Sequence, residues 1–176
     1  MRRFTVENEF AASVAELEAL LDSPALHERL QRAMPAIDAI EPLERLEDER
    51  EVRRRVRYRP NVDGKIPAFG RGVVKPEMLA WVEESVWDKA AHRYRYRIVP
   101  NLPAAWRDRF DSHGSYQLTA TARGVHRLIE GEIHVRVPLV GGLVERMLVK
   151  EVEQNFRAEA EALRRFLADT RAASLR

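Results

Sequence analysis

The C-terminal part of the chain constrains the fold more than any other feature. Residues 129–137 alternate apolar and polar side chains, which is typical of a strand with one buried face. Residues 138–142, with the sequence PLVGG, interrupt this alternation, and an amphipathic helix is predicted from there to about Asp169. A long strand that turns sharply into a long helix favours a curved sheet wrapped around that helix. Such a shape tends to leave a cavity.

Composition favours one ordinary globular domain. The chain has 176 residues, 45% hydrophobic and 33% charged, so we expect a single domain over residues 1–176. The absence of cysteine excludes disulfides and thiolate metal sites, and it is compatible with a reducing cytoplasm. No apolar run approaches the roughly 20 residues of a membrane span, and a formal charge of +2 is too small to indicate a nucleic-acid partner. We therefore expect a cytoplasmic protein without a membrane span.

The rest of the chain predicts a strand, two short helices and six further strands. Ser13 and Glu16 have the spacing of a capping box, and Pro24 is well placed to begin a second helix, which Pro35 ends. Residues 61–76 are rich in glycine and proline and predict a loop. The predicted strands are 2–10, then three hairpins formed by 37–47 with 51–59, 78–88 with 91–99, and 113–122 with 125–137.

This order of elements, together with PLVGG at 138–142, resembles the START-like or helix-grip superfamily (SRPBCC), and within it an uncharacterised bacterial branch. The resemblance implies an α+β helix-grip fold, with a seven-stranded antiparallel sheet wrapped around a long C-terminal helix and two short helices after strand one. It also implies that a hydrophobic ligand often lies between sheet and helix. PLVGG marks the fold, because proline ends the strand and the glycines permit a tight entry into the helix. The resemblance transfers no catalytic residue to this chain.

Aromatic side chains on three predicted strands are candidates for lining a cavity. Tyr94 and Tyr96 share one face of their strand, Trp81 and Trp87 share one face of the neighbouring strand, and Tyr58 faces away from the arginines around it. If the tyrosine face points inward, these rings would contact a ligand. The alternative is that they fill the core, and the two interpretations are compatible.

Polar and loop residues complete the candidate site. On the final helix, Glu151 and Asn155 fall within the apolar stripe and could bind the polar end of a ligand; alternatively, the stripe drifts and leaves them in water, because buried unpaired carboxylates are costly. Phe69 and Trp106 lie in loops that could form a lid or a membrane-touching tip, or simply pack. The candidate ligand-binding residues are Tyr58, Phe69, Trp81, Ser85, Trp87, Tyr94, Tyr96, Trp106, Met147, Glu151 and Asn155.

Seven arginines, at alternate positions in 53–59 and 93–97, are expected on one face of the sheet. They could contact the phosphates of nucleic acid or the head groups of an anionic membrane. However, the neighbouring strands are acidic, which favours cross-strand ion pairs on a solvated face. Their acidic residues are Glu41, Glu44 and Glu47 on one strand and Glu83, Glu84 and Asp88 on the other. Nucleic acid is therefore disfavoured as a partner, whereas peripheral membrane contact stays an alternative.

Enzyme motifs are absent from the sequence. It has no HExxH, GxSxG or Walker motif, and its histidines lack zinc-ligand spacing, so we expect no metal, no cofactor and no catalytic residue. The predicted function is non-catalytic binding, transport or sensing of a hydrophobic small molecule or lipid between the sheet and the C-terminal helix. One alternative is a polyketide-cyclase-like or hydrolase-like enzyme that uses His92 and a carboxylate in the same pocket. The other is a protein- or membrane-interaction module with a vestigial cavity.

Overall fold

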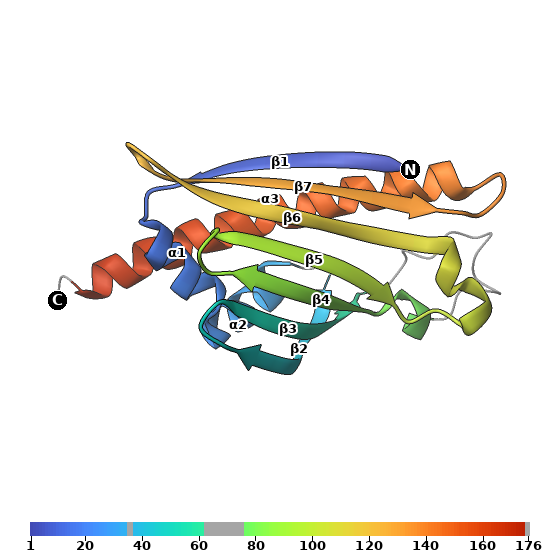
Figure 1. Ribbon diagram of the computed structural model, residues 1–176, viewed down its shortest axis with the longest axis horizontal. Helices are drawn as coiled ribbons and strands as arrows, with labels where there is room; N and C mark the ends of the chain where they lie inside the picture. Colours follow the sequence, from blue (N-terminus) through green and yellow to red (C-terminus); the bar gives the residue numbers. More distant parts are fainter. Residues whose placement is uncertain (35–36, 62–75, 175–176) are drawn as a thin grey trace.

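The computed structural model describes residues 1–34, 37–61 and 76–174. Within these ranges, seven strands form one antiparallel sheet in the order β1-β7-β6-β5-β4-β3-β2, and the sheet curves around α3 (Figure 1). The expected α+β helix-grip architecture is confirmed. In chain order the elements are β1 (Arg2–Phe10), α1 (Val14–Leu21), α2 (Pro24–Ala33), β2 (Ile37–Glu47), β3 (Glu51–Pro60), η2 (Pro76–Leu79), β4 (Trp81–Asp88), β5 (Arg93–Pro100), η3 (Ala104–Arg109), β6 (Phe110–Thr121), β7 (Gly124–Val135) and α3 (Gly141–Ser174).

The two short helices begin where the sequence predicts. The Glu16 amide donates to Ser13 Oγ at 3.2 Å, and the Ser13 amide donates to Glu16 Oε2 at 2.7 Å, which completes a capping box. Pro24 is the first residue of α2, where its missing N–H costs no hydrogen bond. Leu17 and Leu26 are buried, so both helices pack into the core.

The three predicted hairpins are confirmed, with small shifts at their ends. β4 begins at Trp81 because η2 occupies the residues before it, and β6 begins already at Phe110, where η3 ends. β7 ends at Val135, two residues earlier than expected, and α3 continues past Asp169 to Ser174.

Two glycines bring α3 close to the centre of the sheet. Phe4, Gly131, Gly114 and Tyr96 lie side by side across β1, β7, β6 and β5. A Cβ on Gly131 would lie 2.5 Å from the Phe4 ring, and one on Gly114 would lie 2.5 Å from the Tyr96 hydroxyl. Phe156 of α3 lies near both rings, 6.3 Å from Phe4 and 6.5 Å from Tyr96 between centroids. The missing side chains therefore provide the space in which these rings pack.

The long helix covers the concave face unevenly. Its main contacts are with β1, β7 and α2, and in Figure 1 it runs behind the half of the sheet that contains β1, β7 and β6. It has few contacts with the part of the concave face formed by β3, β4 and β5. None of the helices in the described ranges has the length and hydropathy that a bilayer span requires.

Candidate functional site

Aromatic rings line the concave face over β3, β4 and β5. Trp87, Tyr94 and Tyr96 are buried there, whereas the arginines of β5 point outward and are exposed, so the tyrosine face is the inner one, as the sequence interpretation required. Tyr58 and Trp81 stack with ring centroids 5.3 Å apart and an interplanar angle of 10°. These two residues are half-buried and pack against the core. They are the least buried of these five aromatic residues.

Glu83 is the acidic group of this wall. It lies on β4 between Trp81 and Ser85, on the same face, and the Tyr94 hydroxyl donates to its Oε1 at 2.5 Å. Burial raises the pKa of Glu83, although the Tyr94 hydrogen bond and the positive charge of Arg54 act in the opposite direction. The residue as a whole is half-buried. This carboxyl therefore takes up a proton more readily than a surface glutamate and can accept from or donate to a bound molecule.

Two arginines on the inner face bracket a pair of stacked tyrosines. The rings of Tyr94 and Tyr116 lie 4.5 Å apart. The Arg54 guanidinium lies 5.3 Å from the Tyr94 ring, and the Arg127 guanidinium lies 5.5 Å from the Tyr116 ring. Arg54 also donates to Asp22 Oδ1 at 3.2 Å, which ties the wall to the end of α1.

Arg127 is the most deeply buried charge of the inner face. Its side chain has no solvent exposure, and its Nη2 lies 2.9 Å from Glu159 Oε2 of α3. The two atoms are not aligned for a hydrogen bond, and Arg127 Nε and Nη1, Asn8 Nδ2 and Tyr96 Oη also lack a hydrogen-bond partner within the described part of the protein. Buried donors without acceptors are costly, so a water or a polar ligand atom that accepted a hydrogen bond from one of these groups would stabilise the protein.

Sequence interpretation missed Arg54, Arg127 and Glu159, although a signal was present. Arg127 alternates in phase with Val125 and Ile129, and Arg54 in phase with Val52 and Val56. Each arginine therefore occupies an inward position of its strand. On β3 the signal is easily overlooked, because Arg54 is flanked by the outward-facing arginines at 53 and 55.

On α3 the inward positions differ from those expected. Glu151 is exposed, which agrees with the alternative that the apolar stripe drifts and leaves it in water, while Asn155 is partly buried. Met147 is also exposed, so its expected inward position is wrong. The buried carboxylate near the start of the helix is Glu145, which accepts from the Val135 amide at 2.9 Å; this hydrogen bond lowers the pKa of Glu145. The inward face is thus rotated toward Glu145 and Glu159, because Leu148, Val149 and Val152 pack against the core.

The remaining candidates lie apart from the wall or within it. Ser85 is buried in the wall, and its hydroxyl donates to the Arg54 carbonyl at 3.5 Å. Phe69 lies outside the described residues. Trp106 borders a surface hollow of about 480 Å³, whose other lining residues are Glu77, Met78, Asn101, Leu102, Pro103 and Arg107.

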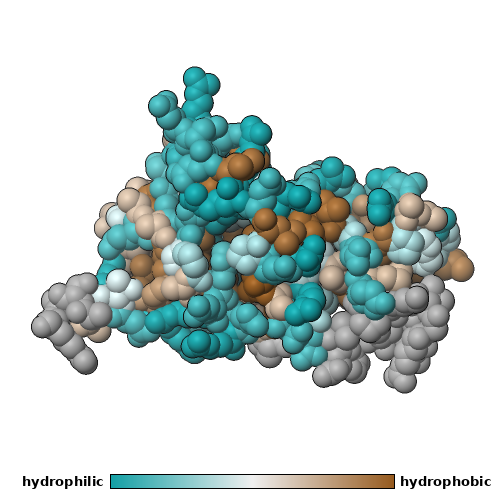
Figure 2. Space-filling view, turned by 90° about the horizontal axis from the view of Figure 1, so that it is seen from below, coloured by the Kyte–Doolittle hydropathy of each residue, from teal (hydrophilic) through white to brown (hydrophobic). Residues whose placement is uncertain are grey.

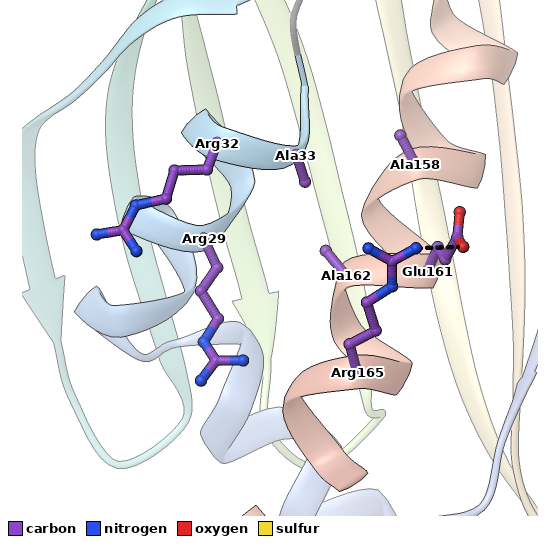
Figure 3. Close-up of a pocket in the computed structure, with 7 residues that line it drawn as sticks. All are labelled: Arg29, Arg32, Ala33, Ala158, Glu161, Ala162 and Arg165. Carbon is purple, nitrogen blue, oxygen red and sulfur yellow. Dashed lines mark hydrogen bonds and ion pairs between the residues drawn. The ribbon is translucent and has the colours of Figure 1, made fainter. Parts of the chain in front are cut away.

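A second hollow, of about 440 Å³, lies between α2 and α3 (Figure 3). Arg29 and Arg32 of α2 and Arg165 of α3 border it, and its other lining residues are Ala33, Ala158, Glu161 and Ala162. The three arginines have acidic partners: Asp169 for Arg29 at 2.6 Å, Glu28 for Arg32 at 3.9 Å, and Glu161 for Arg165 at 2.7 Å. Because a carboxylate compensates each of these arginines, the hollow is poorly suited to bind an anion.

The outer face of the sheet carries the expected ion pairs. Arg57 lies 2.9 Å from Glu41, and Arg55 lies 3.4 Å from Glu84, across neighbouring strands. His92 pairs with a carboxylate as well, since its Nδ1 lies 2.6 Å from Glu18 Oε1. His92, however, lies in the turn between β4 and β5 and its side chain is 45% exposed, while Glu18 lies on α1.

Comparisons with known proteins agree with this architecture. Residues 5–167 match the family described as "Protein of unknown function (DUF2505)". The chain belongs to this family. The DUF2505 match spans the sheet and most of α3, so the aromatic wall and the Arg127–Glu159 pair lie within the family's domain. No protein with curated annotation matches the sequence significantly.

Solved structures similar to this DUF2505 protein have the same fold at low sequence identity. TTHA0849 from Thermus thermophilus is 17% identical, with a TM-score of 0.68 over 96% of this chain and 99% of that chain. The Zhui aromatase/cyclase from Streptomyces sp. R1128 is 18% identical, with a TM-score of 0.61 over 92% and 90%. Norcoclaurine synthase from Thalictrum flavum is 15% identical, with a TM-score of 0.64 over 95% and 86%. The helix-grip fold is therefore shared with these proteins.

Proposed function

We propose that this protein binds a hydrophobic small molecule on the concave face of β3, β4 and β5, beside α3. The observation that carries the proposal is the stacked pair Tyr58 and Trp81, which keeps partial exposure on an inner face. Covering the exposed part of such apolar rings with a ligand removes apolar surface from water, and this favours binding. Viewed from below, apolar residues are visible in the middle of the molecule between polar ones (Figure 2).

The polar groups of the wall indicate what kind of ligand would bind. Glu83 offers one carboxyl, and Tyr96 has a buried hydroxyl without a hydrogen-bond partner among the described residues. A ligand with an apolar body and a hydroxyl or amine group would match this surface. Its apolar body would contact the aromatic rings, and its polar group would hydrogen-bond the Glu83 carboxyl or the Tyr96 hydroxyl. This combination favours specific binding of an amphipathic molecule over non-specific uptake of oil-like compounds.

The test combines native mass spectrometry with titration of the fluorescent probe 1-anilinonaphthalene-8-sulfonate. A reproducible apolar adduct on the purified protein would identify the natural ligand by extraction. Trp81→Ala should weaken probe binding roughly tenfold, since a buried aromatic contact is removed. Trp106→Ala removes the same ring from the surface hollow and is the matched variant. Weaker binding in Trp106→Ala with full binding in Trp81→Ala would move the site away from the concave face.

Catalysis is the second candidate function, and Glu83 is the observation that favours it. Its raised pKa suits a general acid or base, and the Tyr94 hydrogen bond fixes its orientation. Two of the similar structures are enzymes by name, an aromatase/cyclase and norcoclaurine synthase. Once the ligand is known, conversion of it by the wild type but not by Glu83→Gln would establish this candidate. Retention of unchanged ligand would leave binding as the function.

A further inference from the structure

The turn between β7 and α3 exposes an apolar side chain at a conformational cost. Leu139 is fully exposed, the most exposed large apolar residue in the described ranges. Its φ of 67° lies in the left-handed region, which disfavours residues with a Cβ. A strained leucine normally gains packing in return, but this one packs against little of its own protein. The strain is understandable if the leucine acts on something outside the molecule.

The following helix extends this exposed surface. Leu143 and Met147 are 43% and 47% exposed, and they lie one above the other on the first turns of α3. Together with Leu139 they form a patch that we call the turn patch. Three of the six most exposed large hydrophobic residues in the described parts of the chain gather here, at one end of the sheet (Figure 1).

Basic residues surround the turn patch. Arg136, Arg146 and Lys150 are exposed, and the one acidic residue between positions 136 and 150, Glu145, is buried. Glu145 is also engaged, because it accepts from the Val135 amide and lies 2.9 Å from the N-terminal ammonium. Its negative charge is thereby withdrawn from the surface. Acidic residues return further along α3, from Glu151 onward.

The short helix η3 carries exposed Arg107, Asp108 and Arg109 and so adds a net positive charge to the same region. The Arg136 amide donates to the Arg109 carbonyl at 2.7 Å, and the Arg136 side chain donates to the Asp108 carbonyl at 3.0 Å. Arg107 and Arg109 are exposed beside it, with the Arg109 guanidinium 6.0 Å from the Trp106 ring. Exposed apolar side chains with arginines and a lysine beside them are typical of surfaces that enter the head-group region of a bilayer.

We propose that this end of the protein docks on an anionic lipid bilayer, with the turn patch inserted at head-group level and the surrounding basic residues against the lipid phosphates. The inference does not depend on a ligand at the concave face. Covering one leucine changes an association constant roughly ten- to a hundredfold. Each basic residue near an anionic surface contributes roughly fivefold.

Vesicle sedimentation tests the proposal. We expect the wild type to bind phosphatidylcholine vesicles that contain phosphatidylglycerol, to bind pure phosphatidylcholine much more weakly, and to lose affinity as salt rises. Leu139→Asn should weaken binding roughly tenfold or more, while Leu46→Asn, an equally polar change at the exposed Leu46 on β2, should not. Arg146→Glu should also weaken binding about tenfold or more, unlike Arg123→Glu in the β6–β7 turn, at the opposite end of the sheet.

Depth of insertion gives an independent readout. The chain has no cysteine, so Leu139→Cys can carry a single environment-sensitive label. Its fluorescence should rise on anionic vesicles and be quenched by spin-labelled lipid, whereas a label at Leu46→Cys should not respond. Wild-type protein that ignores anionic vesicles, or Leu139→Asn that binds them at full strength, overturns the proposal. Arg146-dependent binding to a DNA duplex without vesicle binding would replace the bilayer with nucleic acid.

Discussion

The carboxylate of Glu159 lies 2.9 Å from the guanidinium of Arg127, at a depth where the arginine side chain has no contact with solvent. This pair joins α3 to β7 inside the core. The guanidinium of Arg127 also lies over the rings of Phe10 and Tyr116, at 5.3 and 5.5 Å from their centroids. The helix is thus held to the sheet by a buried charge pair as well as by apolar packing.

Removing one charge of this pair should be costly. Glu159→Gln leaves the buried arginine without its counter-charge, so we expect the free energy of unfolding to fall by about 3–5 kcal/mol. Urea denaturation followed by circular dichroism measures the change. Glu161→Gln removes an exposed carboxylate two residues away and should cost at most about 1 kcal/mol. Equal losses in the two variants would contradict a special role for the buried pair.

Glu83 should make stability depend on pH. Because burial raises its pKa in the folded state, ionisation of Glu83 opposes folding. The stability that the protonated form of Glu83 contributes is fully present below the ordinary pKa of 4.5 and is lost as pH rises through the folded-state pKa. Glu83→Gln should therefore be more stable than the wild type at pH 8, with an advantage that disappears near pH 4. Urea midpoints across this range, with Glu84→Gln on the exposed face as the control, decide the matter.

A methyl group on Gly114 should disturb the centre of the sheet. Its Cβ would lie 2.5 Å from the Glu130 carbonyl oxygen and 2.5 Å from the Tyr96 hydroxyl, so backbone must move. We expect Gly114→Ala to lower the free energy of unfolding by about 1–3 kcal/mol. Gly142→Ala meets no atom within 4 Å in the first turn of α3 and should be neutral or stabilising by up to about 1 kcal/mol. Thermal unfolding of both variants tests the contrast.

Leu139→Asn should stabilise the isolated protein. Asparagine tolerates the left-handed region better than leucine, and the exposed leucine gives little packing in return. We expect a gain of about 1 kcal/mol, or roughly 2–4 °C in Tm for a chain of this size. Leu143→Asn, in regular helix four residues later, should give no gain. A lower Tm for Leu139→Asn would show that the leucine stabilises its own fold.

Periodicity and capping made the fold predictable. The capping box at Ser13, Pro24 at the start of α2 and the alternation in each hairpin are local signals, and local structure follows them. The inner face of β5 was also predictable, because Tyr94 and Tyr96 alternate with arginines. Whether the whole chain is one domain stays a prediction.

The site was less predictable, because its key residues depend on distant partners. Arg127 is buried only because Glu159 and the rings of Phe10 and Tyr116 surround it. No single strand pattern contains those contacts. The position of Glu151 stayed open and that of Met147 was wrong, because a small rotation of a long helix changes which residues face the sheet, and helical spacing alone does not fix that rotation. The ligand roles of Tyr58, Ser85 and Asn155 stay predictions.

The strand order has a consequence for how the chain folds. β1 and β2 follow one another in sequence but form opposite edges of the sheet, and Arg2 pairs with Ile133. During synthesis β1 therefore leaves the ribosome long before its partner β7, while the hairpins between them can close as they emerge. Such non-local pairing slows folding and leaves an unpaired strand exposed in the meantime. We expect β1 to dock last, and nascent chains that stop before β7 to be the species most prone to aggregate.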